Sequence, residues 1–364
     1  MPTRPLLTRY RDDLRLFPDL WHKVGLALFA GVLLVYPFAA GSYWLSIGNV
    51  VLVTTVGAVG LMILTGFTGQ ISLGHAAFLA LGAYTAAVLG TRLGMPFWVI
   101  LPVAGLIAAA VGLAVGPFAL RLRGLYLAIV TVGLLFLVNH LLLSFPQITR
   151  GVAGIGAPTY LWFTEPGTPG ALSTFAETWS LGPLLFTFDR KLYFLFLAIT
   201  IGAVWCGKNL QRSNTGRAMT AVRDHDLAAA VMGVSPARYK IIAFGVSSFI
   251  AGVAGAMFAF QQQFITVDPP FNLLMSIEFI AIIVIGGLGS VFGAVAGALL
   301  YGAVGPVSHT VSGAIPYISA LSSHQQEILA LALVVTVFMV IEPLGLLGVW
   351  LRIKRYFLGW PFRY

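Results

Sequence analysis

Charged side chains are scarce in this chain of 364 residues: Asp, Glu, Lys and Arg together make up 9% of it, against about 25% in a typical soluble domain. Hydrophobic residues make up 59%. A soluble globule of this size would need far more charge on its surface. The composition therefore excludes a soluble protein and predicts an integral membrane protein. Its 26 Phe and 41 Gly suit close packing of helices in lipid.

Cysteine and the common catalytic motifs are also rare or absent. The single cysteine, Cys206, cannot form a disulfide within the chain and indicates no redox role. There is no Gly-x4-Gly-Lys-[Ser/Thr] phosphate loop, so we expect any ATP and Mg²⁺ to be bound by partner proteins. No His, Cys, Asp and Glu residues have the spacing of a metal site, and no nucleophile and base pair is evident. We expect neither enzyme activity nor a metal or cofactor in this chain.

Ten apolar stretches occur along the sequence, and each has about the length that a helix needs to cross 30 Å of hydrocarbon. Two of them, 191–206 and 273–287, are short. We predict an all-α, polytopic helical bundle with a transmembrane domain at 24–350, a cytoplasmic segment at 1–23 and a cytoplasmic tail at 351–364. The ten stretches are 24–42, 47–66, 71–91, 97–118, 124–145, 191–206, 241–262, 273–287, 290–309 and 326–347.

The net charge of +9 follows the predicted topology. With the N-terminus in the cytoplasm, four of the 21 Lys and Arg residues fall outside the cytoplasmic segments: Arg92, Arg150, Arg190 and Lys191. This distribution fits the positive-inside rule and argues against nucleic-acid binding. A cleavable signal ending near Ala40 is the less favoured alternative, because the first 23 residues are too long and too mixed in charge.

Two glycine-dense stretches, 66–82 and 286–302, resemble each other and lie in opposite halves of the chain. Such pairs are typical of a repeated transporter core whose helices are broken near the middle of the membrane. The alternative is that glycine only lets helices pack closely. We favour packing for three positions: Gly82, Gly297 and Gly302. We favour a functional break at 66–75 because four polar side chains gather there: Thr68, Gln70, Ser72 and His75.

A polar, basic segment at about 207–240 interrupts the apolar sequence and predicts two short helices. Asp224 is expected to cap the second helix, and Gly233 to end it ahead of Pro236. Arg217, Arg223 and Asp224 would then rim an apolar face that docks a soluble partner; a helix lying on anionic lipid is the alternative. The apolar face would consist of Met219, Val222, Leu227, Val231 and Met232.

The longest predicted external segment, about 146–190, is rich in glycine and proline. It is long for a connection within a helical bundle. Two interpretations stay open for it, a docking surface for a partner and a lid over the bundle.

Several motifs occur in a characteristic order between about 45 and 350. They are GQISLGHAAF (69–78), GAY (82–84), LRLRGLYLA (120–128), GRA (216–218), AVR (221–223), MG (232–233), SIE (276–278), GGLGS (286–290) and PLGLLG (343–348). Together they resemble the signature of bacterial high-affinity branched-chain amino-acid ABC permeases, and most closely the larger permease subunit of such systems.

The resemblance implies a set of partners and a location. They are a second permease subunit, two ATP-binding subunits, a periplasmic substrate-binding protein and the lipid bilayer of the bacterial inner membrane. It also implies that the 207–240 segment couples the permease to the ATPases. The broader importer pattern, Glu-Ala-Ala-x3-Gly, falls on Leu227, Ala228, Ala229 and Gly233, where Leu227 replaces the glutamate.

Two groups of residues are candidates for function. The group expected at the ATPase contact is Arg217, Arg223, Asp224, Ala228, Ala229 and Gly233. The group expected near the substrate path is Gln70, Ser72, His75, Glu278, Gly286, Gly287 and Gly289. A charge in the bilayer centre costs about 2.5–3.5 kcal/mol on insertion scales, so Glu278 should face a cavity or a partner. A structural pairing is equally open for Glu278, and a packing role is the commoner one for a buried histidine such as His75.

Three other functions remain as alternatives. A related permease could carry urea and short amides, or aromatic acids. An ion-coupled secondary transporter working alone would use Glu278 as its coupling carboxylate. A structural membrane scaffold would explain neither the glycine-dense stretches nor the polar segment.

Overall fold

The computed structural model describes residues 20–120, 124–157, 179–181, 184–312, 321–342 and 344–359. The predicted cytoplasmic segment 1–23 and the middle of the predicted external segment, 158–178, lie largely or wholly outside these ranges. The predicted tail 351–364 is described only as far as residue 359.

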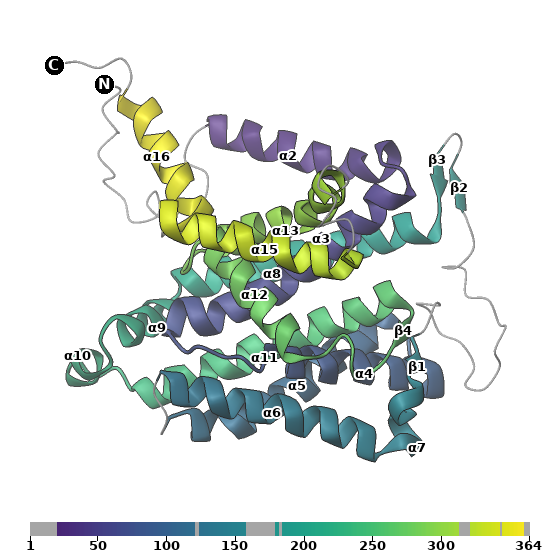
Figure 1. Ribbon diagram of the computed structural model, residues 1–364. Helices are drawn as coiled ribbons and strands as arrows, with labels where there is room; N and C mark the ends of the chain where they lie inside the picture. Colours follow the sequence, from purple (N-terminus) through teal and green to yellow (C-terminus); the bar gives the residue numbers. More distant parts are fainter. Residues whose placement is uncertain are drawn as a thin grey trace.

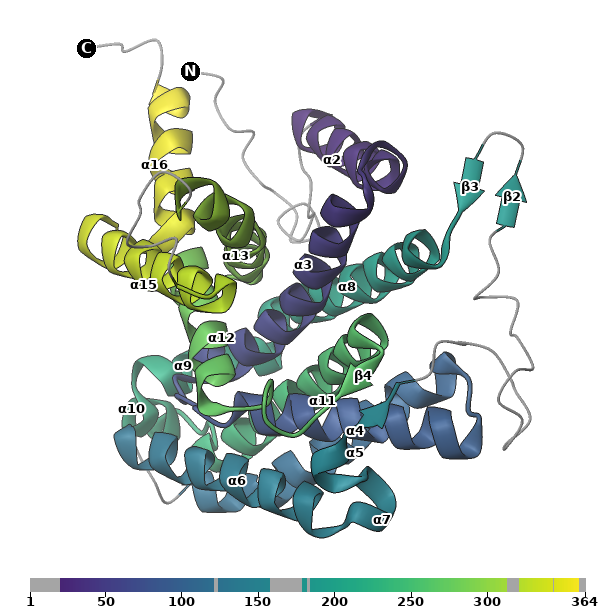
Figure 2. The same ribbon diagram turned by 45° about the vertical axis from the view of Figure 1, so that its right-hand side comes forward.

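Helices make up nearly all of the described chain (Figures 1 and 2). They are α2 (Leu20–Ala39), α3 (Ser42–Leu61), the π-helix η1 (Met62–Phe67), α4 (His75–Leu93), α5 (Phe97–Leu120), α6 (Leu125–Ser144), α7 (Pro146–Thr149), the 3-10 helix η2 (Gly151–Ala153), α8 (Phe188–Arg212), α9 (Asn214–Asp224), α10 (Asp226–Val231), α11 (Pro236–Gln262), α12 (Leu273–Gly286), α13 (Val291–Ser312), α15 (Ser323–Ile341) and α16 (Gly345–Gly359).

Four very short strands form two antiparallel pairs. They are β1 (Ile155–Gly156) with β4 (Phe264–Ile265), and β2 (Trp179–Leu181) with β3 (Leu184–Phe186). The strands and α7 lie at one end of the bundle, whereas α9 and α10 lie at the opposite end (Figure 1). The described parts of the predicted external segment are therefore on the side away from the polar 207–240 segment.

The predicted count of ten membrane spans is not confirmed. Seven helices of the described chain are long and apolar enough to cross a membrane, and an eighth results if the bent pair α15 and α16 forms one span. The predicted stretches 24–42 and 273–287 correspond to shorter apolar helices, Ala27–Ala39 and Leu273–Gly286. The stretch 191–206, expected to be short, belongs to a helix of 25 residues, α8.

The core of the bundle lies around α11, which packs most extensively against α5, α4 and α3. Small residues allow this close approach. A Cβ atom at Gly82 of α4 would lie 2.0 Å from the carbonyl oxygen of Gly252 in α11, and one at Gly297 would lie 2.1 Å from that of Ile282. A Cβ atom at Gly302 would meet the Val51 side chain at 2.1 Å. The packing role predicted for these three glycines agrees with the structure.

Both glycine-dense stretches contain a real helix break. In the first, α3 continues into η1, residues 69–74 leave the helix with Gly69 at φ +70°, and α4 begins at His75. In the second, α12 ends at Gly286, and Gly287 and Gly289 adopt φ +110° and +90° before α13 begins. Both breaks contact residues of α8 or α9 at one end of the bundle. Their expected position near the middle of the membrane stays a prediction. A repeat of the whole core remains a prediction.

Candidate functional site

The polar segment begins with a sharp turn from α8 into α9. The Ser213 hydroxyl accepts a hydrogen bond from the Gly216 backbone N–H at 3.1 Å and so caps α9. A side chain at Gly216 has no room, because its Cβ atom would lie 2.0 Å from the Leu210 carbonyl oxygen. The turn therefore fixes α9 against the end of α8.

The two predicted short helices are present as α9 and α10, but the predicted cap of the second is wrong. The residue at its N-cap is His225, whose Nδ1 accepts from the Ala228 N–H at 3.5 Å. Asp224 is the last residue of α9, and its carboxylate pairs with Arg223 at 2.9 Å. The helix boundary lies one residue later than the sequence pattern suggested.

The end of α10 has the glycine geometry that the sequence predicts. Gly233 has φ +84°, the Val234 N–H donates to the Ala229 carbonyl at 2.9 Å, and the Gly233 N–H donates to the Ala230 carbonyl at 3.0 Å. This pair of hydrogen bonds is the Schellman motif. The backbone leaves the helix at this motif and continues to Pro236, the first residue of α11.

The predicted apolar docking face is divided between two directions. Met219 and Val222 of α9 are 0% and 3% exposed and pack into the helical bundle. Leu227, Val231 and Met232 are 62%, 88% and 82% exposed, and they lie on or beside α10, which projects from the bundle (Figure 1). We call these three residues the α10 surface. A projecting group of large apolar side chains is typical of an interaction site.

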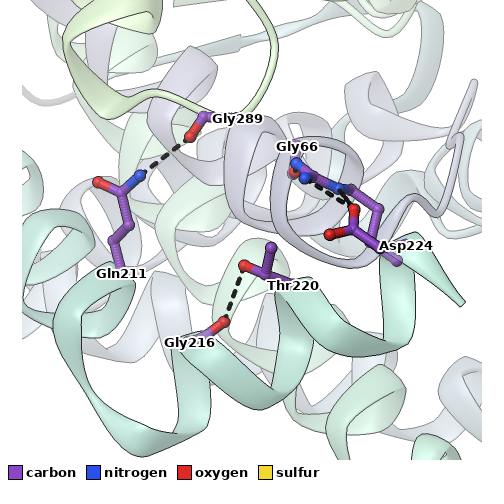
Figure 3. Close-up of polar contacts among 7 residues, drawn as sticks. Gly66, Gln211, Gly216, Thr220, Asp224 and Gly289 are labelled. Carbon is purple, nitrogen blue, oxygen red and sulfur yellow. Dashed lines mark hydrogen bonds and ion pairs between the residues drawn. The ribbon is translucent and has the colours of Figure 1, made fainter. Parts of the chain in front are cut away.

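Arg223, expected at the ATPase contact, reaches toward the helical bundle. Its Nη1 donates to the Gly66 carbonyl in η1 at 2.8 Å (Figure 3). A Cβ atom at Gly69 would lie 3.0 Å from Arg223 Cγ, and one at Gly289 would lie 3.0 Å from Nη1. Arg223 therefore covers glycines of both helix breaks, and a contact with an ATPase remains a prediction.

A second connection comes from the end of α8. The Gln211 side chain donates to the Gly289 carbonyl at 3.0 Å (Figure 3) and accepts from Lys208 Nζ at 2.9 Å. Gln211 was not among the sequence candidates; its position at the polar end of a long amphipathic helix is the signal that could have identified it. The breaks also touch each other, since a Cβ atom at Gly66 would lie 3.0 Å from the Gly289 nitrogen. Arg223 and Gln211 thus join the polar segment to both breaks.

The other residues predicted at the ATPase contact lie in the same segment. Arg217 is exposed on α9 and donates to the Asn214 side chain. Ala228 is exposed on α10, whereas Ala229 is buried and supplies a carbonyl to the helix end. Arg217, Ala228 and the α10 surface are therefore exposed on this segment, whereas Ala229 is buried.

The residues predicted for the substrate path are not gathered in one place. Gln70 lines a cavity of about 330 Å³ beside the polar segment, and its amide donates to the Lys240 carbonyl at 3.3 Å. Ser72 is buried and accepts from the Gly74 N–H at 3.4 Å. Gly286 and Gly287 are packing positions, because their Cβ atoms would lie 1.9 Å from the Gly293 carbonyl oxygen and 2.6 Å from the Leu344 carbonyl oxygen.

His75 has the geometry of a packing histidine. Its Nε2–H donates to the Gly57 carbonyl at 3.0 Å, and its ring lies edge-on to Phe279 at 5.0 Å between centroids. The side chain is buried and both contacts come from neighbouring helices. Of the two roles left open by the sequence, the structure favours packing.

Glu278 lies elsewhere, on α12, where it is half-buried. It lines two cavities of about 300 and 260 Å³, and its Oε2 accepts from the Tyr301 hydroxyl at 3.2 Å. Among the predicted path residues, it is the one that lines these cavities.

Comparison with known proteins gives one family for most of the chain. The family described as branched-chain amino acid transport system / permease component matches residues 43–342. The high-affinity branched-chain amino acid transport system permease protein LivM of Escherichia coli K12 is 36% identical over 287 residues, which are 75% of this chain and 66% of that protein. LivM of Salmonella typhimurium is 35% identical over 76% of this chain and 66% of its own length.

A second kind of relative is more distant. The permease protein LivH of Salmonella typhimurium is 25% identical over 304 residues, covering 80% of this chain and 90% of its own length. No solved structure matches the chain. The matched region spans about two thirds of the length of the LivM relatives.

Proposed function

Because this chain belongs to the family of branched-chain amino-acid ABC permeases, we propose that it is the transmembrane subunit of a bacterial importer that moves branched-chain or closely related amino acids into the cytoplasm. As a permease, the chain is not an enzyme. ATP and Mg²⁺ would be bound by two partner ATPase subunits. A second permease would complete the path, and a periplasmic binding protein would deliver the substrate from outside.

The strongest support for this proposal is that the polar segment has one side that is exposed and one side that is bonded to the helix breaks. Its outward side presents the α10 surface, whose three apolar residues suit a groove on a soluble partner. Its inward side is attached through Arg223 and Gln211 to the carbonyls of Gly66 and Gly289. A movement of the partner would therefore be passed to the ends of η1 and α12, where glycine allows the backbone to bend.

The two kinds of relatives support a paired permease. Proteins named as LivM and as LivH both match this chain, as expected if the importer contains two related permease subunits. The higher identity to LivM supports the assignment of this chain to the larger type.

Copurification tests the assembly. The tagged chain, extracted from native membranes, should bring with it two ATP-binding subunits and a second multispan protein. The binding protein of the same system can then be tested with leucine, urea and aromatic acids. A chain that is recovered alone, and that transports alone under an ion gradient, would overturn the proposal in favour of a secondary transporter.

A substitution at Gly233 tests the docking role of α10. We expect Gly233→Asp to abolish uptake while the chain still inserts, because it adds a charge next to the α10 surface. Among the described residues, nothing lies within 4 Å of a Cβ atom at this position, so there is room for the side chain. Gly233→Asn is the matched control, because asparagine tolerates a positive φ and has the same shape without the charge. Equal uptake in the two variants would show that the charge at this surface is unimportant.

A further inference from the structure

The two cavities that meet at Glu278 extend from one end of the bundle to its middle. Their lining includes Tyr43, in the first turn of α3, and Thr54, halfway along the continuous helix Ser42–Phe67. These two residues are about 16 Å apart along the helix axis. The far end of that helix carries Gly66, at the polar segment. The cavities therefore approach the interior from the side opposite to α9 and α10.

A tightly packed layer closes the inner end of these cavities. Phe279 lines the cavity of about 260 Å³ and lies against Gly57, whose Cβ atom would be 2.5 Å from the Phe279 ring. The His75 ring also lies edge-on to Phe279, at 5.0 Å between centroids. The space beside Glu278 is thus separated from the cavity beside Gln70 and shares no lining residue with it.

Besides the side chains of Thr54, Gln262, Asn272 and Tyr301, which can donate and accept hydrogen bonds, two strong acceptors lie in the wall of this space. Among the described residues that line the cavity of about 260 Å³, Glu278 is the one with a formal charge. An ionised carboxylate only accepts hydrogen bonds. The Gln261 side-chain oxygen is buried in the same wall and has no hydrogen-bond partner among the described residues. A group that only donates, such as an ammonium, complements these acceptors.

Most of the remaining wall is apolar. It is formed mostly by aliphatic and aromatic side chains, among them Val50, Val53, Leu79, Phe258 and Ile282. Its volume is near the lower end of the range of about 300–1,000 Å³ for small-molecule sites. The space suits a small ligand that combines one cationic group with an apolar side chain.

We propose that Glu278 binds the α-ammonium group of a small amino acid, whose apolar side chain lies against the wall formed by Val53, Leu79 and Phe258. Tyr301 holds the carboxylate in place through its hydroxyl hydrogen bond. This inference rests on the proposed import function and names the part of the chain that recognises the substrate. Uncharged cargo such as urea has no ammonium group to use the carboxylate, and an aromatic acid would be repelled by it.

Charge-selective labelling tests the site directly. In the assembled importer, with Cys206→Ser to remove the native thiol, Met275→Cys places a thiol in this wall one helical turn before Glu278. We expect a cationic thiosulfonate to label it at least about tenfold faster than an anionic one. Glu278→Gln should remove the preference for the cationic reagent. The control is Glu327→Gln, because Glu327 lines the cavity of about 300 Å³ but not the cavity of about 260 Å³. This control should leave the preference unchanged. A preference that survives Glu278→Gln would overturn the inference, and Leu274→Cys repeats the test if Met275→Cys does not assemble.

Protection by ligands tests the chemistry of recognition. Leucine and isopentylamine, which share an ammonium group, should both slow labelling at Met275→Cys, whereas isocaproate, which has only the carboxylate, should not. Equal protection by isocaproate would contradict the inference. Uptake measurements distinguish a failure of the ammonium-site inference from a failure of the proposed import function. An importer that takes up leucine normally with Glu278→Gln refutes the ammonium site alone, and one that takes up no amino acid even in its native form refutes the function itself.

Discussion

At the scale of single residues, Arg223 connects the polar segment to the transport core. It lies on α9, but its guanidinium points inward to the Gly66 carbonyl, and its stem covers Gly69. Hydrogen bonds with a charged partner contribute about 1.5–3 kcal/mol. That is enough to keep α9 and η1 together during a movement driven from outside.

Replacement of Arg223 should uncouple hydrolysis from transport. We expect Arg223→Met to lower uptake at least about tenfold, because the donor to Gly66 is lost while α10 still presents its surface to the ATPase. ATP hydrolysis stimulated by the binding protein should continue. The control is Arg238→Met, the same change at an exposed arginine of the first turn of α11. If Arg223→Met instead prevents the ATPase from copurifying, Arg223 acts in docking and not in transmission.

At the scale of helices, α4 and α11 cross with almost no space between their backbones. Besides Gly82, Gly255 lies at this crossing, where its Cβ atom would be 2.0 Å from the Leu79 carbonyl oxygen. Main-chain atoms cannot move aside as the end of a flexible side chain can, so the crossing depends on glycine on both helices.

An added methyl group should therefore force α4 and α11 apart. We expect Gly82→Ala to destabilise the permease by about 1–3 kcal/mol, the usual cost of overpacking. The effect is measurable as a lower unfolding temperature in detergent. Gly133→Ala on α6 is the control, because no atom in the part of the chain that the structure describes lies within 4 Å of its Cβ atom. Equal stability of the two variants would mean that the helices can separate without cost.

Local features of these elements could be predicted from the sequence, and their long-range contacts could not. Glycine near 66–74 and 286–289 marks helix breaks because the signal is in the residues themselves. Gly233 likewise predicts the end of α10. The direction of Arg223, however, depends on a carbonyl 157 positions away, and the division of the apolar face between Met219 and Met232 depends on how α9 rests on the bundle. A hydropathy pattern also cannot tell a spanning helix from a shorter interior one such as α12.

At the scale of the whole molecule, the two ends of the bundle differ in chemistry. One end carries α9, α10 and their basic residues, and the other carries η2 and the short strands (Figure 1). The positive-inside rule predicts that the basic end faces the cytoplasm. This orientation is required by the proposed function, because ATPase subunits are soluble and the Glu278 cavities must receive substrate from the opposite side.

Thiol accessibility in intact cells tests this orientation. In the Cys206→Ser background, Val152→Cys on η2 and Val231→Cys on α10 place single thiols at the two ends, at residues that are 87% and 88% exposed. We expect a membrane-impermeant maleimide to label Val152→Cys in intact cells, and to label Val231→Cys only in inside-out vesicles from which the ATPase has been stripped. The two variants act as controls for each other because both side chains are equally open. Labelling of Val231→Cys from outside the cell would place α10 in the periplasm, where no ATPase could reach it. That result would contradict the coupling role of the polar segment.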